Sequence, residues 1–382
     1  MLTFRSNRNE PLHEQGAERL RQYIRRRHLR AGDTIPRIQD LCSYLNISYV
    51  TVHKALAVLS RKGLVAPIRG KGTFVTKRGA AETGPIQIGL VAVGTYDNML
   101  TVPYRLDMFR GVVSAASAGH ADVRMFSMKD PAGRLTSRQL QQMEIDGLLV
   151  LELADPAILR RFARSGVPVI AADSCVPDVP LDYVVCDDEG AVEQVVRHLV
   201  DLGHRRIHFA GGFAVHPVTR AIVESWSTTV RRNGYMAAMR GAGLTPVCHT
   251  WRDRSPIPGR AAEIPRYREM ARRILAARPQ PTAIVGYDGD VCRKLLPFLT
   301  EAGMRVPRDL SLVAVACATT DTQAKESSLS HCAFDFRELG MQSTGRLLDR
   351  FRDPAGPLEQ AAIHRIGFTF VPGGTCSPWR GD

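Results

Sequence analysis

The sequence predicts an α/β protein in two parts, a small amino-terminal domain of three helices and a hairpin, and a larger two-lobed α/β domain. Continuous apolar runs alternate with helical stretches through most of the chain, which is typical of parallel sheets covered by helices. Before residue 80, an apolar helical stripe is followed by a basic hairpin with two glycines. At 382 residues the chain exceeds what one hydrophobic core usually organises, so two or three domains are expected.

Positive charge is concentrated at the amino terminus. Residues 1–80 hold sixteen Lys or Arg against five acidic residues, a net charge of +11, whereas the remaining 302 residues carry a net charge of +2. We therefore expect a polyanion-binding surface in the amino-terminal fifth of the chain. The alternative is a solvated basic tail around "RQYIRRRH".

Composition limits the classes of protein to consider. With 44% hydrophobic and 23% charged residues, the chain is typical of soluble globular proteins, and no apolar run approaches the roughly 18 residues of a membrane span. The start "MLTFRSNRNEPLHEQ" lacks the apolar middle of a secretory signal, so a cytoplasmic location is expected. Eight single cysteines without a C-x-x-C pair predict buried thiols rather than a zinc or redox site.

Helical periodicity predicts the first three elements. Apolar positions predict one helix over 12–27 and a second over 38–46, and the sharp turn "NIS" leads into a third. Ser48 is placed to cap the third helix and to offer its hydroxyl and the helix-end amides to a phosphate. The third helix has an inward apolar stripe and a separate outward set, which are Val52, Leu56 and Leu59 against Tyr49, His53 and Lys54.

A basic hairpin is predicted next. The β-prone runs "GLVAPI" and "GTFVT" flank "RGKG". Gly70 and Gly72 permit a tight turn and a close approach to a nucleic-acid backbone, while Arg69 and Lys71 supply charge. The hairpin therefore predicts the wing of a winged helix.

Three segments follow one another over residues 11–77, namely "PLHEQGAERLRQYI", "LRAGDTIPRIQDLCSYLNISYVTVHKALAVLSRKGLV" and "RGKGTFV". Taken in this order, they resemble the winged helix-turn-helix domain of the GntR family of bacterial transcription regulators. The resemblance implies that a domain over residues 1–77 binds double-stranded DNA. The candidate DNA-contacting residues are Arg37, Gln39, Ser48, Tyr49, Thr51, His53, Lys54, Arg69, Lys71 and Gly72.

Two departures from the family pattern bear on DNA sequence preference. The second helix begins Pro36-Arg37-Ile38-Gln39 where the family commonly has Pro-Ser-Glu-Arg, and Tyr49 and His53 stand where arginines are common. Because arginine forks favour guanine edges, we expect a different operator. The alternatives are a partly buried Tyr49 in the helix corner and a His53 that is a plain surface residue.

Beyond a linker predicted at residues 78–85, apolar runs predict parallel strands in two lobes over residues 86–376. The runs are "IQIGLVAV", "DGLLVLEL", "VPVIAAD", "RRIHFAGG", "PTAIVGY" and "LSLVAVA". Ligands of such folds bind outside the carboxyl ends of the strands, so residues just after these runs are candidates.

Four further segments stand out in this region, namely "VVCDDEGAVEQVVRHLVDLGHRRIHFAGG", "RRNGYMAAMRGAGL", "PTAIVGYDGDVCRKLLPFLTEAGMRVPRDLSLVAV" and "FDFRELGMQSTGRLL". Through them, residues 86–372 resemble the periplasmic-binding-protein-like (type I) effector domain of the lac-repressor family. The resemblance implies two lobes that close around a small molecule, often a sugar, and a homodimer.

The resemblance also implies a set of effector-binding residues. Asp173 matches a ligand-contacting aspartate at a strand end, and Arg231, in "RRNG", matches an arginine that grips ligand hydroxyls. Tyr287 replaces an asparagine and Ala316 an aspartate, so an effector less polar than a hexose, or one that stacks on an aromatic ring, is expected. The candidate effector-binding residues are Tyr96, Asp173, Trp226, Arg231, Tyr287 and Asp288.

Each candidate has a structural alternative. Asp173 can cap a strand end, Arg231 can form a salt bridge at the lobe interface, and Trp226 can be a core aromatic. The acidic run 187–189 suggests a metal, but three acids that open a helix more often complement its dipole, and we predict neither a metal nor a cofactor.

These patterns predict a transcription regulator, and repression is the expected mode of regulation. We expect the protein to bind a pseudo-palindromic operator as a homodimer, under control of a small-molecule effector. The alternatives are a regulator that has lost its ligand response and a solute-binding module. An enzyme is not expected, because no nucleophile elbow, P-loop, dinucleotide fingerprint or pyridoxal-phosphate lysine pattern is found.

Overall fold

The computed structural model divides by compactness into two units, residues 1–87 with 120–122 and 348–357, and the remainder. The structure describes residues 11–27, 29–45, 47–81, 85–93, 100–128, 145–165, 167–211, 214–215, 222–223, 225–251, 263–321, 326, 328–352 and 362–381.

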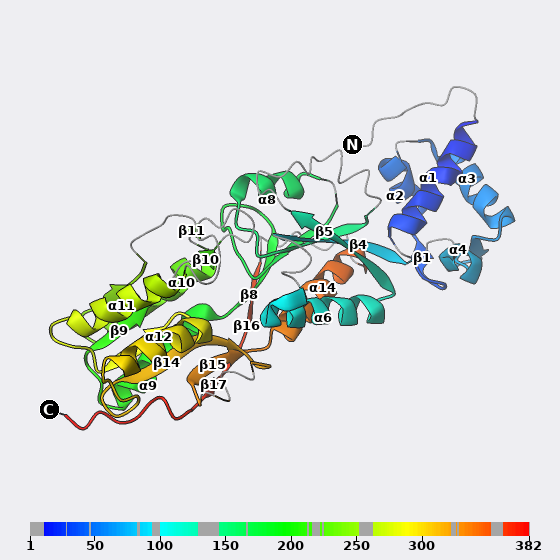
Figure 1. Ribbon diagram of the computed structural model, residues 1–382. Helices are drawn as coiled ribbons and strands as arrows, with labels where there is room; N and C mark the ends of the chain where they lie inside the picture. The colour runs from blue at the N-terminus through cyan, green and yellow to red at the C-terminus, as the bar shows by residue number, and fades with distance from the viewer. Residues whose placement is uncertain are drawn as a thin grey trace. The chain divides into compact units, whose positions relative to one another are not determined.

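The amino-terminal unit is a winged helix-turn-helix, as predicted (Figure 1). Its core is formed by the apolar faces of three helices and the base of the hairpin, with Leu20, Val52 and Leu59 each 1% exposed or less. The elements are α1 (Leu12–Arg26), β1 (Thr34–Ile35), α2 (Ile38–Leu45), α3 (Tyr49–Arg61), β2 (Val65–Ile68), β3 (Gly72–Val75) and α4 (Lys77–Ala81).

The sequence did not predict β1, a two-residue strand that pairs antiparallel with β3 and completes a three-stranded sheet in the order β1-β3-β2. Part of the predicted linker, residues 78–85, is helical. Residues 77–81 form α4, which Thr76 caps by accepting the Gly79 N–H at 3.0 Å. A Cβ on Gly79 would lie 2.1 Å from the Leu64 carbonyl oxygen, so this glycine permits close packing rather than flexibility.

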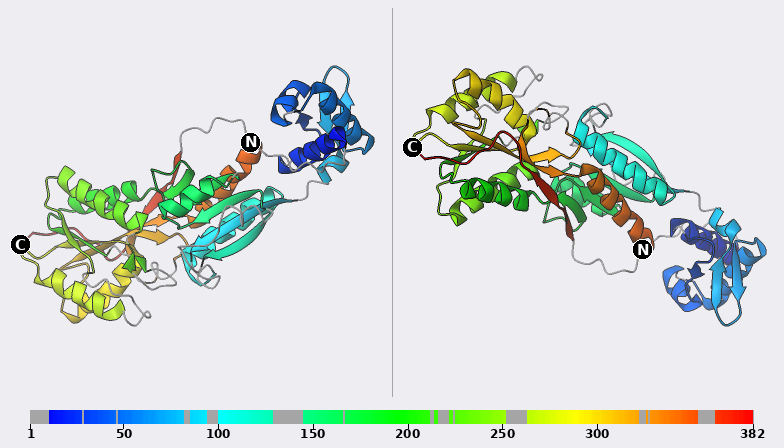
Figure 2. Two further views of the ribbon diagram at one scale, coloured as in Figure 1. Left: turned by 90° about the horizontal axis from the view of Figure 1, so that it is seen from above. Right: turned by 90° about the horizontal axis from the view of Figure 1, so that it is seen from below.

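The carboxyl-terminal unit contains two six-stranded sheets among the described residues, one in each lobe (Figures 1 and 2). The first sheet has the order β16-β8-β7-β6-β4-β5. Its strands are β4 (Ile86–Val93), β5 (Ala121–Met128), β6 (Gly147–Leu151), β7 (Val169–Ala172), β8 (Asp182–Cys186) and β16 (Ile363–Ile366).

The second sheet has the order β12-β9-β13-β14-β15-β17, and all its printed pairings are parallel except that of β15 with β17. Its strands are β9 (Ile207–Ala210), β12 (Val247–His249), β13 (Ala283–Gly286), β14 (Ser311–Ala318), β15 (Ser330–Phe334) and β17 (Phe368–Val371); β10 (Ala214–Val215) and β11 (Ile222–Val223) form a separate ribbon. The six strands predicted from apolar runs are all confirmed.

Helices cover these sheets, which confirms the predicted α/β architecture. They are α6 (Pro103–Ala118), α8 (Pro156–Ala163), α9 (Asp188–Asp201), α10 (Trp226–Gly241), α11 (Ile264–Ala276), α12 (Gly289–Glu301) and α14 (Phe336–Arg352). Although far apart in sequence, α6 and α14 lie side by side (Figure 2) because Gly111 and Gly340 let their backbones approach.

The chain passes between the lobes at three places, since β8 is followed by α9, β15 by α14, and β16 by β17. The first and third crossings are bonded to each other, because the Asp187 N–H donates to the Ile366 carbonyl at 2.9 Å. Each lobe keeps its own core, and five of the eight cysteines are buried, as the sequence predicted. No helix in the described part of the chain is both long and apolar enough to cross a bilayer.

Candidate functional site

The outward face of α3 is exposed along its first two turns. Tyr49 is 57% exposed, and His53 and Lys54 are exposed as well, while Val52 and Leu59 face the core. The alternative of a partly buried Tyr49 in the helix corner is therefore wrong.

The start of α3 is fixed by the predicted cap. The Ser48 Oγ accepts the N–H of Thr51 at 3.3 Å and lies 2.8 Å from the Thr51 Oγ1. Thr51, predicted as a DNA contact, is half-buried and already bonded to Ser48, whereas Ser48 is exposed. The amino end of α3 presents its positive dipole end to solvent, where an anion is favoured.

The wing is the β2–β3 hairpin, with Ile68 opposite Gly72. The Lys71 N–H donates to the Ile68 carbonyl at 3.0 Å across a turn in which Gly70 has φ of +76°, a conformation that favours glycine. Arg69, Lys71 and Gly72 are exposed on it, and Arg37 and Gln39 are exposed at the start of α2. The predicted DNA-contacting residues thus lie on the surface of one small domain, apart from the half-buried Thr51.

In the carboxyl-terminal unit, two acidic residues follow neighbouring strands of the first sheet. Glu152 comes directly after β6 and Asp173 directly after β7. Both have left-handed backbones, with φ of +56° and +59°, and the sheet fixes them because Glu152 N–H donates to Ala172 O and Asp173 N–H to Val184 O. Strained non-glycine residues of this kind gather at binding sites.

Glu152 is fully engaged within the first lobe. Its carboxylate accepts two bonds from the Arg105 guanidinium, at 3.1 Å from Nε and 2.6 Å from Nη2, and a third from the Tyr104 hydroxyl at 2.5 Å. The side chains of Arg105 and Glu152 are only 17% and 14% exposed. A bidentate ion pair that is shielded from solvent in this way holds both side chains rigidly.

Arg231 is also paired. Its Nε donates to Asp188 Oδ1 at 2.8 Å and its Nη1 to the Tyr287 carbonyl at 3.1 Å, and its guanidinium lies 4.5 Å from the centroid of the Tyr287 ring. Asp188, α10 and Tyr287 all belong to the second lobe. The predicted salt-bridge alternative for Arg231 is therefore present, but inside one lobe rather than at the interface. Because Asp188 is 1% exposed, replacing Arg231 would leave a buried charge unpaired.

Unlike the carboxylates of Glu152 and Asp188, the carboxylate of Asp173 makes no hydrogen bond to any of the described residues. Burial, and then the negative charges of Glu152 and Asp188, raise its pKa well above the ordinary value, while Arg231 and Arg105 oppose the shift. Burial likewise raises the pKa of Asp188 against the lowering effect of Arg231. We call the inter-lobe cluster the set Tyr104, Arg105, Glu152, Asp173, Asp188, Arg231 and Tyr287.

The remaining predicted effector residues have other roles in the packing. Trp226 begins α10 and packs, half-buried, against the core of the first lobe, as its core alternative stated. Asp288 caps α12 by accepting the Val291 N–H at 2.8 Å, and burial raises its pKa. The Tyr287 hydroxyl lies 2.8 Å from Ser227 Oγ. Tyr96 lies outside the described residues.

Four members of the cluster were not predicted, namely Tyr104, Arg105, Glu152 and Asp188. Glu152 could have been found, because it is the polar residue that follows the apolar letters "LLVL" within the predicted run "DGLLVLEL". Asp188 had been treated only as part of an acidic helix start, and Asp187 does cap α9 by accepting the Gly190 N–H. In the described ranges no three His, Cys, Asp or Glu side chains gather as metal ligands would.

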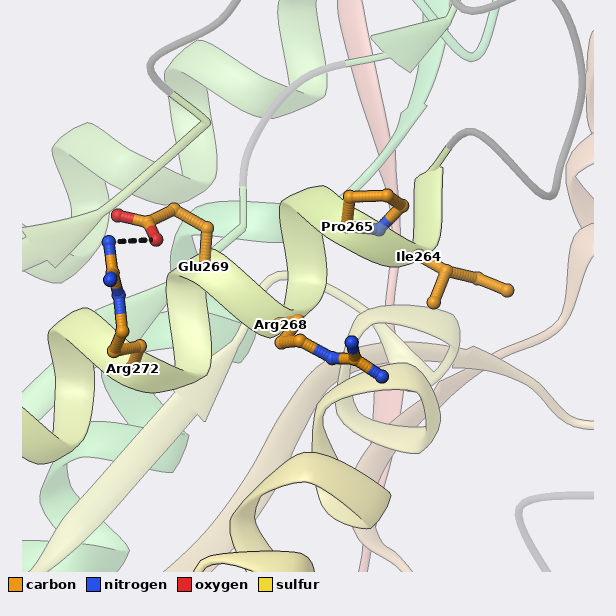
Figure 3. Close-up of a pocket in the computed structure, with 5 residues that line it drawn as sticks. All are labelled: Ile264, Pro265, Arg268, Glu269 and Arg272. Atoms are coloured by element: carbon orange, nitrogen blue, oxygen red, sulfur yellow. Dashed lines mark ion pairs between the residues drawn. The ribbon is translucent and has the colours of Figure 1, made fainter.

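A separate shallow depression of about 260 Å³ lies on the surface of α11 (Figure 3). A single helix lines it with Ile264, Pro265, Arg268, Glu269 and Arg272, and the last two form an ion pair at 2.6 Å. None of the predicted effector residues contributes to it.

Comparison with known proteins follows the same division. Residues 12–75 match the family model of bacterial regulatory proteins of the gntR family, and residues 196–376 match that of a periplasmic binding protein-like domain. The chain thus combines two regions that match different family models, the arrangement that the sequence predicted for a transcription regulator.

Individual relatives agree with this class. The chain is 28% identical over 197 residues to an HTH-type transcriptional regulator in the aml 5' region of Streptomyces limosus, which is 47% of this chain and about half (53%) of that protein. It is 25% identical over 356 residues, 89% of each chain, to the arabinose metabolism transcriptional repressor of Geobacillus stearothermophilus. The fold is similar to that of the lac repressor dimer bound to operator, with a TM-score of 0.62 and 20% identity over 80% of this chain and 99% of that one.

Proposed function

We propose that this protein represses transcription by binding a pseudo-palindromic operator as a homodimer through α3 and the wing, and that a small-molecule effector bound at the inter-lobe cluster controls this binding. The observation that supports it most is the pairing, in one chain, of an exposed basic α3–wing surface with a buried polar cluster at the carboxyl ends of β6 and β7.

The effector is a sugar or related metabolite that offers hydroxyl donors. Arg105 and Arg231 are each bonded to a carboxylate already, so an anionic effector would have to displace Glu152 or Asp188. Asp173, by contrast, has acceptor oxygens available to a hydroxyl group. The arabinose metabolism repressor supports the sugar class, since its name refers to the metabolism of a sugar.

The test has two arms on the full chain. In the first, duplexes enriched from a randomised library should bind with an affinity that falls steeply with salt. In the second, a thermal-shift screen compares neutral pentoses and hexoses with their phosphates, and Asp173→Asn serves as the matched variant because asparagine tolerates the left-handed backbone. Neutral sugars should stabilise the wild type and not the variant. Stabilisation by phosphates alone would contradict this effector class.

A regulator without ligand response is the second candidate. It is favoured by Ala316, which is 5% exposed inside β14 and offers no hydrogen-bonding group where the lac-repressor family has an aspartate. Salt-sensitive DNA binding that no compound in the screen alters would support this candidate. An absence of DNA binding, together with a stabilising sugar, would instead support a solute-binding module.

A further inference from the structure

Large apolar side chains are exposed on the DNA-binding elements of the amino-terminal unit. Among its described residues, the exposed large apolar side chains are Leu12, Tyr49, Val50 and Ile68. Tyr49 and Val50 are the first two residues of α3, and Ile68 ends β2, where the turn of the wing begins. A single exposed apolar residue needs no explanation, but three of these four lie on the two elements expected to contact DNA.

The outward face of α3 carries little charge. Its exposed residues over the first three turns are Tyr49, Val50, His53, Lys54 and Ala57, of which Lys54 alone is a fixed cation. Arginine and lysine side chains, which read guanine, are therefore scarce on this face. Val50 is 61% exposed and has no polar atom, so it can distinguish bases only through an apolar contact.

Duplex DNA is the occupant that the surrounding charge favours. Lys54 is exposed on α3 itself, Arg69 and Lys71 are exposed on the wing of the same small domain, and the positive end of the α3 dipole lies at the start of the apolar face. In the major groove, the one apolar group on the edges of the bases is the C5-methyl of thymine. Residues at the amino end of a recognition helix are those that reach the base edges.

Resting on the DNA-binding function proposed above, we infer that Val50 reads the C5-methyl group of a thymine in each operator half-site. Ser48 fixes the first turn of α3 through its bond to the Thr51 N–H, so the Val50 Cα is held in place. A valine in a helix has one strongly preferred χ1 rotamer, and its methyl groups are presented with little entropy to lose on binding.

The experiment uses the full-length protein and duplexes enriched from a randomised library. Each thymine of the enriched half-site is replaced in turn by deoxyuridine, which differs only in lacking the methyl group. At one thymine per half-site the wild type should bind about fourfold more weakly, the value of one buried methyl-sized group. Val50→Ala should bind the thymine and uracil duplexes equally, and alanine favours the helix, so the variant keeps its fold.

Leu12→Ala is the matched control, because Leu12 is 59% exposed and lies on α1 rather than on α3 or the wing. It should retain the full fourfold response. Enriched duplexes without thymine, or an equal response to uracil in wild type and Val50→Ala, would overturn the inference. In either case, salt-sensitive DNA binding would still support the proposed function. If no duplex is enriched and no DNA binds, both fail.

Discussion

At the scale of single residues, the backbone of Asp173 explains why its side chain is informative. A φ of +59° costs free energy in an aspartate, and its carboxylate stands near Glu152 and Asp188, whose charges repel it. A folded protein gains no stability from this arrangement, so we interpret Asp173 as a residue kept for binding at the expense of stability.

Asp173→Asn should therefore stabilise the carboxyl-terminal unit at neutral pH. The pKa of Asp173 is raised in the folded state, so the folded state binds its proton more tightly than the unfolded chain does. Its contribution to stability is complete below the unfolded pKa of about 4 and is lost as pH rises through the raised folded value. The melting temperature of the variant should exceed that of wild type by about 2–4 °C at pH 7, for about 1 kcal/mol.

The difference between the two proteins should shrink as the pH is lowered toward 4, which melting curves at a series of pH values would measure. Asp178→Asn, at an exposed aspartate of the same lobe, is the control. A variant that is less stable than wild type at pH 7 would mean that Asp173 has a favourable partner.

Lys71 allows a second prediction at this scale. It is exposed in the wing turn, where its ammonium group can contact a phosphate. Lys71→Ala should weaken binding to specific and random duplexes about equally and should reduce the slope of log K against log salt by about one. Arg308→Ala removes an exposed charge from the carboxyl-terminal unit and should leave the slope unchanged. An unaltered slope in Lys71→Ala would exclude the phosphate contact.

Single residues also show the limit of sequence reasoning. Asp173 and Arg231 were found because they match a family pattern, and Glu152 was within reach of the strand-end rule. Arg105 was not, because its pairing with Glu152 joins residues 47 apart in sequence, and no local pattern records such a contact. The partner of Arg231 is hidden in the same way, since Asp188 lies 43 residues before it.

At the scale of elements, long regular patterns were predictable and short mixed ones were not. The strands β4, β6, β7, β9, β13 and β14 are continuous apolar runs. By contrast, β12 and β15 contain His, Cys and Ser, and they become strands because their neighbours in the sheet pair with them. The helix α4 overlaps the predicted linker, because glycine and alanine occur in tightly packed segments as well as in flexible ones.

The amino end of α3 gives a prediction for an element. Ser48→Ala removes the side chain that accepts the Thr51 N–H, which should cost about 1 kcal/mol and speed hydrogen exchange of the first-turn amides of α3. Ser48→Asn should restore protection, because asparagine caps equally well. Ser48→Asp should also restore it, yet weaken DNA binding, since its carboxylate would face phosphates. Unchanged exchange in Ser48→Ala would show that the cap is dispensable.

At the scale of the whole carboxyl-terminal unit, function depends on how the two lobes are held together. The three chain crossings permit the lobes to move relative to each other. A hydrogen bond between a residue after β14 and a residue of α6 opposes this movement. The Thr320 hydroxyl, after β14 in the second lobe, donates to the carboxylate of Asp107, which is 6% exposed on α6 in the first. Arg110 also contacts Asp107, at 3.2 Å, so the carboxylate stays paired when Thr320 is changed.

Thr320→Val should therefore loosen the lobes without leaving an unpaired buried charge. A hydrogen bond to a charged group contributes about 1.5 kcal/mol, so an effector that needs both lobes together should bind about tenfold more weakly to the variant. Exchange of the α6 amides at 104–110 should also be faster. Thr320→Ser keeps the hydroxyl group and should behave as wild type in both measurements. Equal affinity and exchange in Thr320→Val and wild type would show that this contact does not hold the lobes together, and that the effector acts through Asp173 and its neighbours alone.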